Sequence, residues 1–199
     1  MGGDTLGRRK NFLDATVTRQ MMIYFWKTGF KQTTVRELAN LTGLKNQSLY
    51  NAFGNKEQIY QIVLDSYVKF ASNYVDQIMA ETTTNEAKLE RLLVMNWLED
   101  DLPAGCMIIS SFNEFEQISP SLQEIAEKLF DKLRQSFKTI LLKMKVENVV
   151  DTAEMLLTPH NGIQSAVAFH TDTDNIQKIT KQTIQLINQE RGTSYETTI

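Results

Sequence analysis

Apolar side chains recur every three or four positions along most of the chain, which is the spacing of one side of an α-helix. The longest such stripe lies within residues 56–80 and comprises Ile59, Ile62, Val63, Tyr67, Phe70, Tyr74 and Ile78. β-branched residues are scattered rather than alternating, and the chain has 3 prolines. We therefore predict an all-α fold of about nine helices, over residues 8–28, 34–41, 45–53, 56–80, 86–100, 104–118, 120–146, 149–170 and 174–190.

Residues 29–57 combine two short amphipathic helices with a tight turn. Thr33 is a candidate N-cap of the first helix, since a side-chain hydroxyl accepts well from the N–H groups of a first helical turn. Gly43 suits the turn because glycine adopts a left-handed backbone without steric cost. Leu49 and Phe53 lie one turn apart and would bury one side of the second helix. These features in this order predict a helix-turn-helix.

The second short helix also carries polar residues that do not belong to its apolar side. They are Lys45, Asn46, Gln47, Ser48, Tyr50 and Asn51. A helix-turn-helix places the outer face of this helix in the major groove of DNA. Lysine can donate to guanine O6 and N7, and the amides of asparagine and glutamine can pair with adenine. We expect Lys45, Asn46 and Gln47 to contact bases. Ser48 and Asn51 are either further contacts or solvent-facing residues.

The formal net charge of −3 conceals an uneven distribution. Residues 1–60 hold 9 Lys and Arg against 4 Asp and Glu, a net charge of +5. Residues 61–199 therefore carry −8, since +5 and −8 sum to the −3 of the whole chain. A basic segment attracts phosphate, and an acidic remainder keeps the rest of the protein off the nucleic acid. Arg8, Arg9 and Lys10 are either contacts with the DNA backbone or a solvated helix end.

The stretch from Gly29 to Glu57 closely resembles the DNA-binding domain of TetR-family transcriptional repressors. The matching features are Gly29-Phe30, Thr33-Thr34-Val35, Leu38-Ala39, Gly43-Leu44, Leu49-Tyr50, Phe53 and Lys56-Glu57. The resemblance implies a three-helix DNA-binding domain over residues 1–55 and a larger helical domain over residues 56–199 for effector binding and dimerisation. It also implies contacts with phosphates by Thr33, Thr34, Tyr50 and Lys56.

The resemblance further implies a homodimer on a palindromic double-stranded operator. In the family, the last two helices pair with their copies in a second subunit as a four-helix bundle. Helix-turn-helix proteins commonly bind two-fold sites as dimers, which favours a dimer independently. The apolar stripes of residues 149–170 and 174–190 suit either such an interface or a monomer core. Pro159 and Gly162 predict a kink in the penultimate helix.

A small-molecule effector releases a repressor by preferring a conformation that no longer fits the operator. We expect a pocket in the larger domain with apolar and aromatic walls, and hence an apolar or aromatic effector. The predicted walls are Tyr67, Phe70, Tyr74, Trp97, Met107, Phe112, Phe115 and Phe137, and the candidate ligand-binding residues also include Cys106 and His160. Side chains at helical spacing are more often part of an ordinary hydrophobic core, so that interpretation stays open beside the pocket.

Cys106 has two interpretations. Gly105-Cys106-Met107 resembles a Gly-Cys-Leu-like element in one subset of the family, in which a cysteine sometimes senses electrophiles or oxidants. A helix dipole favours the thiolate of a cysteine at a helix N-terminus and so lowers its pKa. The alternative is that Cys106 is a small buried apolar residue. A single cysteine forbids an internal disulfide and suits a reducing compartment.

Several function classes lack support in the sequence. No G-x-S-x-G, H-E-x-x-H, P-loop or dinucleotide fingerprint appears, so we do not expect an enzyme. The 2 histidines and 1 cysteine make a poor metal set, and no cofactor is expected. No apolar run approaches the ~20 residues of a membrane span, and the start lacks a signal-peptide segment, so we expect a cytoplasmic protein. Two rival hypotheses are a body that docks a protein partner and a helical enzyme.

Overall fold

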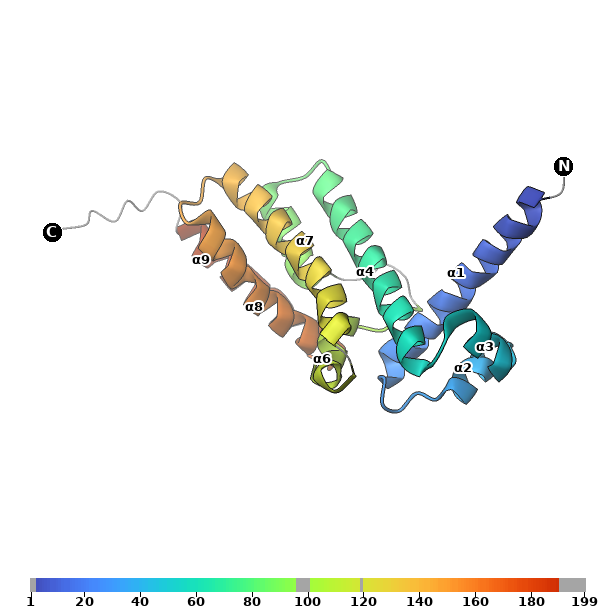
Figure 1. Ribbon diagram of the computed structural model, residues 1–199. Helices are drawn as coiled ribbons and strands as arrows, with labels where there is room; N and C mark the ends of the chain where they lie inside the picture. Colours follow the sequence, from blue (N-terminus) through green and yellow to red (C-terminus); the bar gives the residue numbers. More distant parts are fainter. Residues whose placement is uncertain (1–2, 96–100, 119, 190–199) are drawn as a thin grey trace. The chain divides into compact units, whose positions relative to one another are not determined.

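The computed structural model describes residues 3–95, 101–118 and 120–189, and that part of the chain forms nine α-helices (Figure 1). In chain order they are α1 (Gly3–Thr28), α2 (Val35–Thr42), α3 (Asn46–Phe53), α4 (Lys56–Ala80), α5 (Asn85–Val94), α6 (Met107–Ile118), α7 (Pro120–Met144), α8 (Val149–Ala168) and α9 (Thr173–Gln189). The predicted all-α class is confirmed, and no strand occurs among these residues. Within the same residues, no helix combines the length and apolarity needed to cross a membrane.

The predicted helices agree with the structure to within a few residues in most cases. α4 has the predicted bounds, Lys56–Ala80. The prediction for residues 86–100 is wrong at its C-terminal end, because α5 ends at Val94 and Met95 adopts a left-handed conformation with φ 38°. Residues 96–100 lie outside the described part of the chain.

Two side chains of α8 hold the end of α5 in place. His160 Nδ1 donates to the Leu92 carbonyl at 2.9 Å, and Gln164 Nε2 donates to the Val94 carbonyl. A helix leaves its last carbonyls without intrahelical partners, and these bonds satisfy two of them. The donors lie about seventy positions further along the chain, so the local pattern around Val94 contains no sign of them.

The N-cap of α2 is Thr34, and the prediction of Thr33 is wrong by one position. Thr34 Oγ1 accepts from the Glu37 N–H at 3.2 Å, and the Glu37 carboxylate accepts from the Thr34 N–H at 2.8 Å, which is a capping box. These bonds, the backbone one first, favour the charged carboxylate and lower the pKa of Glu37. Thr33 is instead fully buried, and its hydroxyl donates to the Gly29 carbonyl at 2.7 Å. Adjacent threonines offer the same chemistry, and the backbone path decides which one caps.

The predicted turn and helix-turn-helix are present. Gly43 ends α2 in the left-handed conformation, with φ 71°. Nothing lies within 4 Å of the position that a Cβ would take there, so glycine is required for the backbone angle rather than for space. On either side of the turn, Leu38 and Leu49 are fully buried.

Packing divides the chain into two compact units that are not consecutive in sequence. The first comprises residues up to Phe70 together with Ser110–Glu127, and the second comprises Ala71–Ile109 and residues from Lys128 onward. α4, α6 and α7 therefore each contribute to both units. The predicted boundary between residues 55 and 56 falls in the loop before α4 and stays a prediction.

The core of the first unit is rich in aromatic contacts. Phe25 of α1 meets Tyr60 of α4 edge-on, with ring centroids 4.9 Å apart. Trp26 and Tyr67 make the same kind of contact, also at 4.9 Å. Phe30, in the loop between α1 and α2, lies 5.1 Å from Tyr60. These rings bury the junction from which the helix-turn-helix starts.

In the second unit, α5, α8 and α9 pack on one another. α8 is a single helix that contains Pro159. It approaches the start of α6 closely at Gly105, whose φ is 78°. A Cβ on Gly105 would lie 2.6 Å from the Gln164 carbonyl oxygen and 2.8 Å from Ala168 Cβ. No larger residue fits at this contact without moving α8.

Because His160 is buried, the free energy of unfolding should depend on pH. The imidazole is 2% exposed, and burial lowers its pKa to about 4, although the carbonyls of Leu92 and Leu93 partly oppose the shift. The unfolded chain binds the proton near pH 6.5 and the native state does not, so the free energy of unfolding should fall as pH falls from 6.5 towards 4. The loss attributable to His160 between pH 7 and 5 should be about 2 kcal/mol.

Urea unfolding at pH 7 and pH 5 measures this loss. His160→Gln should remove that part of the pH dependence, whereas His170→Gln, a change at the exposed second histidine, should retain it. An unchanged pH dependence in the His160→Gln variant would show that the buried imidazole is not the titrating group.

Candidate nucleic-acid interface

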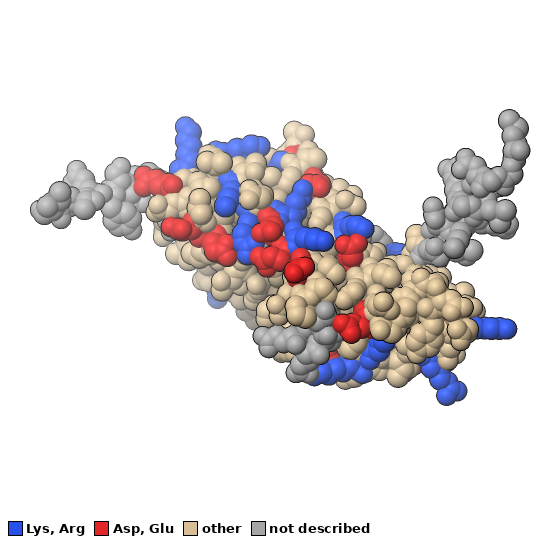
Figure 2. Space-filling model, viewed as in Figure 1, with Lys and Arg blue, Asp and Glu red and all other residues tan. Residues whose placement is uncertain are grey.

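The outer face of α3 is polar and open to solvent. Leu49 is fully buried there, and the exposed residues around it are Lys45, Asn46, Gln47, Ser48, Tyr50 and Asn51. Tyr50 is 48% exposed. On the face shown in Figure 2, Lys and Arg side chains project from the region of α2 and α3. The side chains predicted to contact bases are therefore accessible in the free protein.

Gln47 and Asn51 lie one turn apart on α3 and are hydrogen-bonded to each other. Gln47 Nε2 donates to Asn51 Oδ1 at 3.0 Å. This bond leaves Gln47 Oε1 as an acceptor and Asn51 Nδ2 as a donor on the same exposed face. An acceptor and a donor side by side are complementary to the N6 amino group and N7 of adenine.

Lys45 is the N-cap of α3 and makes no side-chain capping bond. The first turn of α3 holds no acidic residue. Lys31 and Arg36 are also exposed nearby in the sequence. A helix N-terminus with unpaired N–H groups and lysine beside it attracts an anion such as a DNA phosphate.

The two threonines predicted to contact phosphates have different environments. Thr34 is exposed at the N-terminus of α2, where its hydroxyl belongs to the capping box. Thr33 is 0% exposed, and its hydroxyl is 2.7 Å from both the Gly29 carbonyl and the Thr28 hydroxyl. Thr33 therefore stabilises the loop, and we leave it out of the interface proposed below.

Lys56 lies at the start of α4, beside the loop between α1 and α2. Its Nζ is 4.2 Å from the centroid of the Phe30 ring and donates to the Lys31 carbonyl at 3.5 Å. Burial lowers the pKa of Lys56, and the charges of Glu114 and Glu37 partly offset this effect. A phosphate would therefore meet the ammonium group at the loop rather than in open solvent.

Glu114 of α6 is a residue that the sequence analysis missed. Its carboxylate accepts from the Phe30 N–H at 2.8 Å and from the Lys31 N–H at 3.2 Å. The partners are more than 80 positions apart, and both donors are main-chain groups. No side-chain identity in the loop marks the contact, so no sequence pattern could have found it.

The residues predicted to bind an effector have several environments. Phe70 is half-buried, Phe112 is 56% exposed, and the fully or nearly buried ones are Tyr67, Cys106, Met107, Phe137 and His160. They are divided between the two units, with Tyr67, Phe70 and Phe112 in the first. Trp97 and the side chain of Phe115 lie outside the described part of the structure. The role of this set stays a prediction.

A cavity of about 510 Å³ lies among α4, α5 and α9, within the second unit. Its walls are Tyr74, Glu90, Arg91, Val94, Thr173, Ile176, Gln177 and Thr180. Of the predicted pocket residues, Tyr74 is the one found here. Arg91 is ion-paired with Glu81 and donates to the Tyr74 hydroxyl at 3.4 Å, which holds this wall in place.

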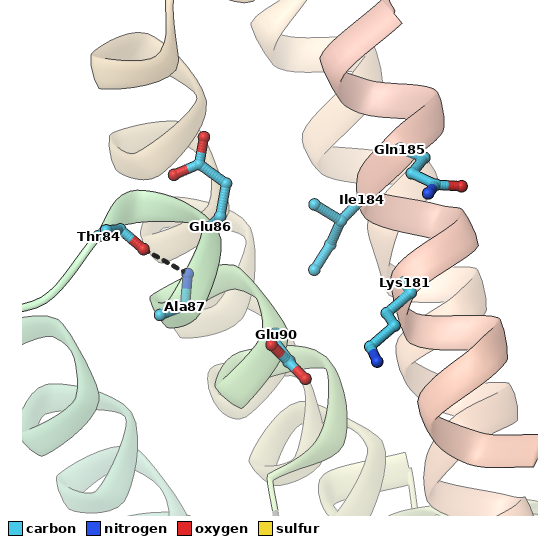
Figure 3. Close-up of a pocket in the computed structure, with 7 residues that line it drawn as sticks. All are labelled: Thr84, Glu86, Ala87, Glu90, Lys181, Ile184 and Gln185. Carbon is cyan, nitrogen blue, oxygen red and sulfur yellow. Dashed lines mark hydrogen bonds between the residues drawn. The ribbon is translucent and has the colours of Figure 1, made fainter. Parts of the chain in front are cut away.

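A second cavity of about 350 Å³ opens between α5 and α9 and shares Glu90 with the first. Figure 3 shows Glu90 and Lys181 extending into the gap from opposite helices, with Ile184 of α9 directed towards α5. Thr84, at the end of this gap, is the N-cap of α5 and accepts from the Ala87 N–H at 3.1 Å.

The helix-turn-helix lies in a segment that matches a known protein family. Residues 22–63 match the family model described as bacterial regulatory proteins, tetR family. The matched segment contains α2, the turn, α3 and the start of α4. It therefore covers the whole of the polar face described above.

The HTH-type transcriptional repressor ComR of Escherichia coli (strain K12) is 32% identical to this chain over 139 residues. The match covers 67% of this chain and 64% of ComR. The chain thus spans slightly less than two thirds of the length of this curated relative.

Solved structures show the same fold. A cysteine mutant of the TetR-family regulator CifR, complexed with 26-bp double-strand operator DNA, aligns with a TM-score of 0.70 and 16% identity over 85% of this chain and 94% of that one. FadR from Bacillus subtilis, in complex with stearoyl-CoA, aligns with a TM-score of 0.62 and 14% identity over 87% of this chain and 97% of FadR. The family-model match and the similarity to ComR show that the chain, which has the fold of these structures, belongs to the TetR family of transcriptional regulators.

Proposed function

We propose that this protein is a DNA-binding repressor that reads an operator with the exposed face of α3. The observation that carries the proposal is the polar outer surface of α3, held in place by the fully buried Leu49. ComR is a repressor, and CifR was solved with operator DNA, which supports the same activity here. The net charge of +5 over residues 1–60 supplies attraction to phosphate.

The contacts divide into positioning and reading. We assign Thr34 and Lys56 to phosphates because they lie at the N-termini of α2 and α4. We assign Tyr50 of α3 to a phosphate through its hydroxyl, as the family resemblance implies. The proposed base contacts are Lys45, Asn46 and the hydrogen-bonded pair of Gln47 and Asn51, with Ser48 between them.

Selection from a randomised duplex library should recover a palindromic sequence, and variants then test the assignment. Gln47→Ala should weaken binding to the selected duplex by about 1–3 kcal/mol and relax preference at the base pair it reads. Asn51→Ala should relax the same position, because Asn51 orients Gln47. Tyr50→Phe should weaken binding to selected and mismatched duplexes by a similar factor, since a phosphate contact carries no sequence information.

Fluorescence anisotropy over a salt series measures these affinities. Gln135→Ala, a change at an exposed glutamine of α7, is the matched control and should leave both duplexes unaffected. The assignment is wrong if Tyr50→Phe loses base preference while Gln47→Ala keeps it.

We also propose a homodimer through α8 and α9. Large apolar side chains are exposed on both helices in the single chain: Val150, Met155, Phe169, Ile179 and Leu186. Met155 and Gly162 are seven positions apart along α8, so they lie on one side of the helix, and Phe169 is the C-cap residue seven positions further on. A Cβ on Gly162 would meet nothing within 4 Å, which leaves room for close approach of a second copy.

Leu186→Glu should convert the dimer to a monomer, because it places a charge in the proposed interface while leaving the monomer core intact. Size-exclusion chromatography with light scattering measures the mass, and affinity for a palindromic duplex should fall because one half-site contact is lost. Leu142→Glu, at a leucine of α7 with 65% exposure, is the control and should remain dimeric. Equal disruption by both variants would argue against this interface.

For the effector, we propose a small molecule in the cavity among α4, α5 and α9. Its volume of about 510 Å³ falls within the range of ligand pockets. Val94, Ile176 and the Tyr74 ring offer apolar surface, and Thr173 and Gln177 offer hydrogen bonds. This lining fits a ligand with an apolar or aromatic body and a polar group at one end. FadR from Bacillus subtilis, which has a similar fold, was solved in complex with stearoyl-CoA, and this supports the proposal of a small-molecule ligand.

A thermal-shift screen tests the cavity. A compound at about one hundred times its Kd should stabilise the wild type by about 2.7 kcal/mol, seen as a raised Tm. Gln177→Trp should fill the cavity and abolish that shift. Gln185→Trp, on the rim of the second cavity, should preserve it. If Gln185→Trp abolished the shift and Gln177→Trp preserved it, the ligand would lie in the second cavity and the assignment to the first cavity would be wrong.

A further inference from the structure

Glu114 connects α6 to the loop that enters the helix-turn-helix. Its two carboxylate oxygens accept from the consecutive N–H groups of Phe30 and Lys31, at 2.8 and 3.2 Å. Gly29, directly before them, has φ 80°, and a Cβ there would lie 3.5 Å from Glu114 Oε2. Successive N–H groups that converge on one point form a concave anion site, and the Glu114 carboxylate fills this one.

Lys56, at the start of α4, also contacts this loop. Lys56 Nζ lies 4.2 Å from the centroid of the Phe30 ring and 3.5 Å from the Lys31 carbonyl oxygen. The Phe30 ring in turn packs on Tyr60 of α4, with centroids 5.1 Å apart. The loop between α1 and α2 is therefore bound to α6 through the Glu114 carboxylate and contacts α4 through Lys56 and Tyr60.

A second bond fastens the same part of the first unit. Gln61 Nε2 of α4 donates to Ser121 Oγ of α7 at 2.7 Å. Both bonds join the segment Ser110–Glu127 to the elements that carry the helix-turn-helix, and both lie inside one compact unit. The Gln61 bond joins two helices. The Glu114 bond is different, because it reaches the loop from which α2 starts.

The loop requires such an anchor because α2 and α3 have 8 residues each. Isolated helices shorter than about 12–15 residues are marginal in water, so tertiary contacts must set their position. Inside the loop, the Thr33 hydroxyl already bonds to the Gly29 carbonyl at 2.7 Å. This bond stiffens the loop but does not fix where the loop lies.

We propose that Glu114 is a positioning residue for DNA recognition, whose carboxylate fixes the loop between α1 and α2 to α6 and so sets the orientation of α2 and α3. Its consequence at DNA rests on the proposed function. Removal of the carboxylate leaves the surface of α3 unchanged. Sequence-specific binding needs a defined orientation of α3 in the groove, whereas non-specific binding needs mainly positive charge. Loss of the Glu114 carboxylate should therefore reduce sequence-specific binding and leave non-specific binding unchanged.

The first measurement needs no DNA. Amide exchange by NMR should show the Phe30 and Lys31 N–H groups at least about tenfold less protected in Glu114→Ala than in the wild type, because each loses a hydrogen bond to a charged group. Glu114→Gln retains one acceptor oxygen and should restore part of the protection. Glu57→Gln removes an equal charge from the first turn of α4 and should leave both amides protected.

The second measurement compares the selected duplex with a scrambled one. Glu114→Ala should lower the ratio of specific to non-specific affinity about tenfold, with Glu114→Gln in between. Glu57→Gln should shift both affinities by one common factor, since it changes only charge. Circular dichroism confirms that each variant is folded under the conditions used.

Unchanged exchange of both amides in Glu114→Ala would overturn the proposal, as would equal changes in specific and non-specific affinity. If the wild type selects no duplex, the proposed function fails instead, and the exchange measurement still decides whether Glu114 fixes the loop.

Discussion

Burial of Leu38 and Leu49 is the constraint on which the rest of the structure depends. Each lies on a helix of 8 residues that could not persist alone, so the two helices exist only while these side chains are held in a core. With Leu49 buried and Phe53 half-buried, the other residues of α3 face outward. The polar surface and the short helices are therefore two results of one packing arrangement.

The helix-turn-helix was predictable because its signals are local. The one-turn spacing of Leu49 and Phe53, the glycine at position 43 and the polar run between residues 45 and 51 all lie within a few positions of the feature that they determine. The N-cap shows the limit of this reasoning. Thr33 and Thr34 carry the same hydroxyl, and only the path of the backbone places one in the core and the other at the start of α2.

The features that could not be predicted from the sequence depend on contacts between residues far apart along the chain. The end of α5 depends on His160 and Gln164 of α8, which donate to carbonyls of Leu92 and Val94 and lie 68 and 70 positions further along the chain. Glu114 reaches the loop in the same way. The aromatic residues expected to wall a pocket illustrate a different limit, because helical spacing reports that a side chain is buried and not whether it faces another side chain or a cavity. Tyr74, which does border a cavity, has the same spacing as Tyr67, which is fully buried.

The partners of Glu114 are backbone amides, and this choice has an evolutionary consequence. Any residue except proline at positions 30 and 31 supplies these N–H groups, so substitutions in the helix-turn-helix can accumulate and the preferred operator can diverge without loss of the link to α6. An insertion or deletion between α1 and α2 would instead carry the two amides away from the carboxylate. We expect this connection to tolerate changes of residue identity and to resist changes of loop length.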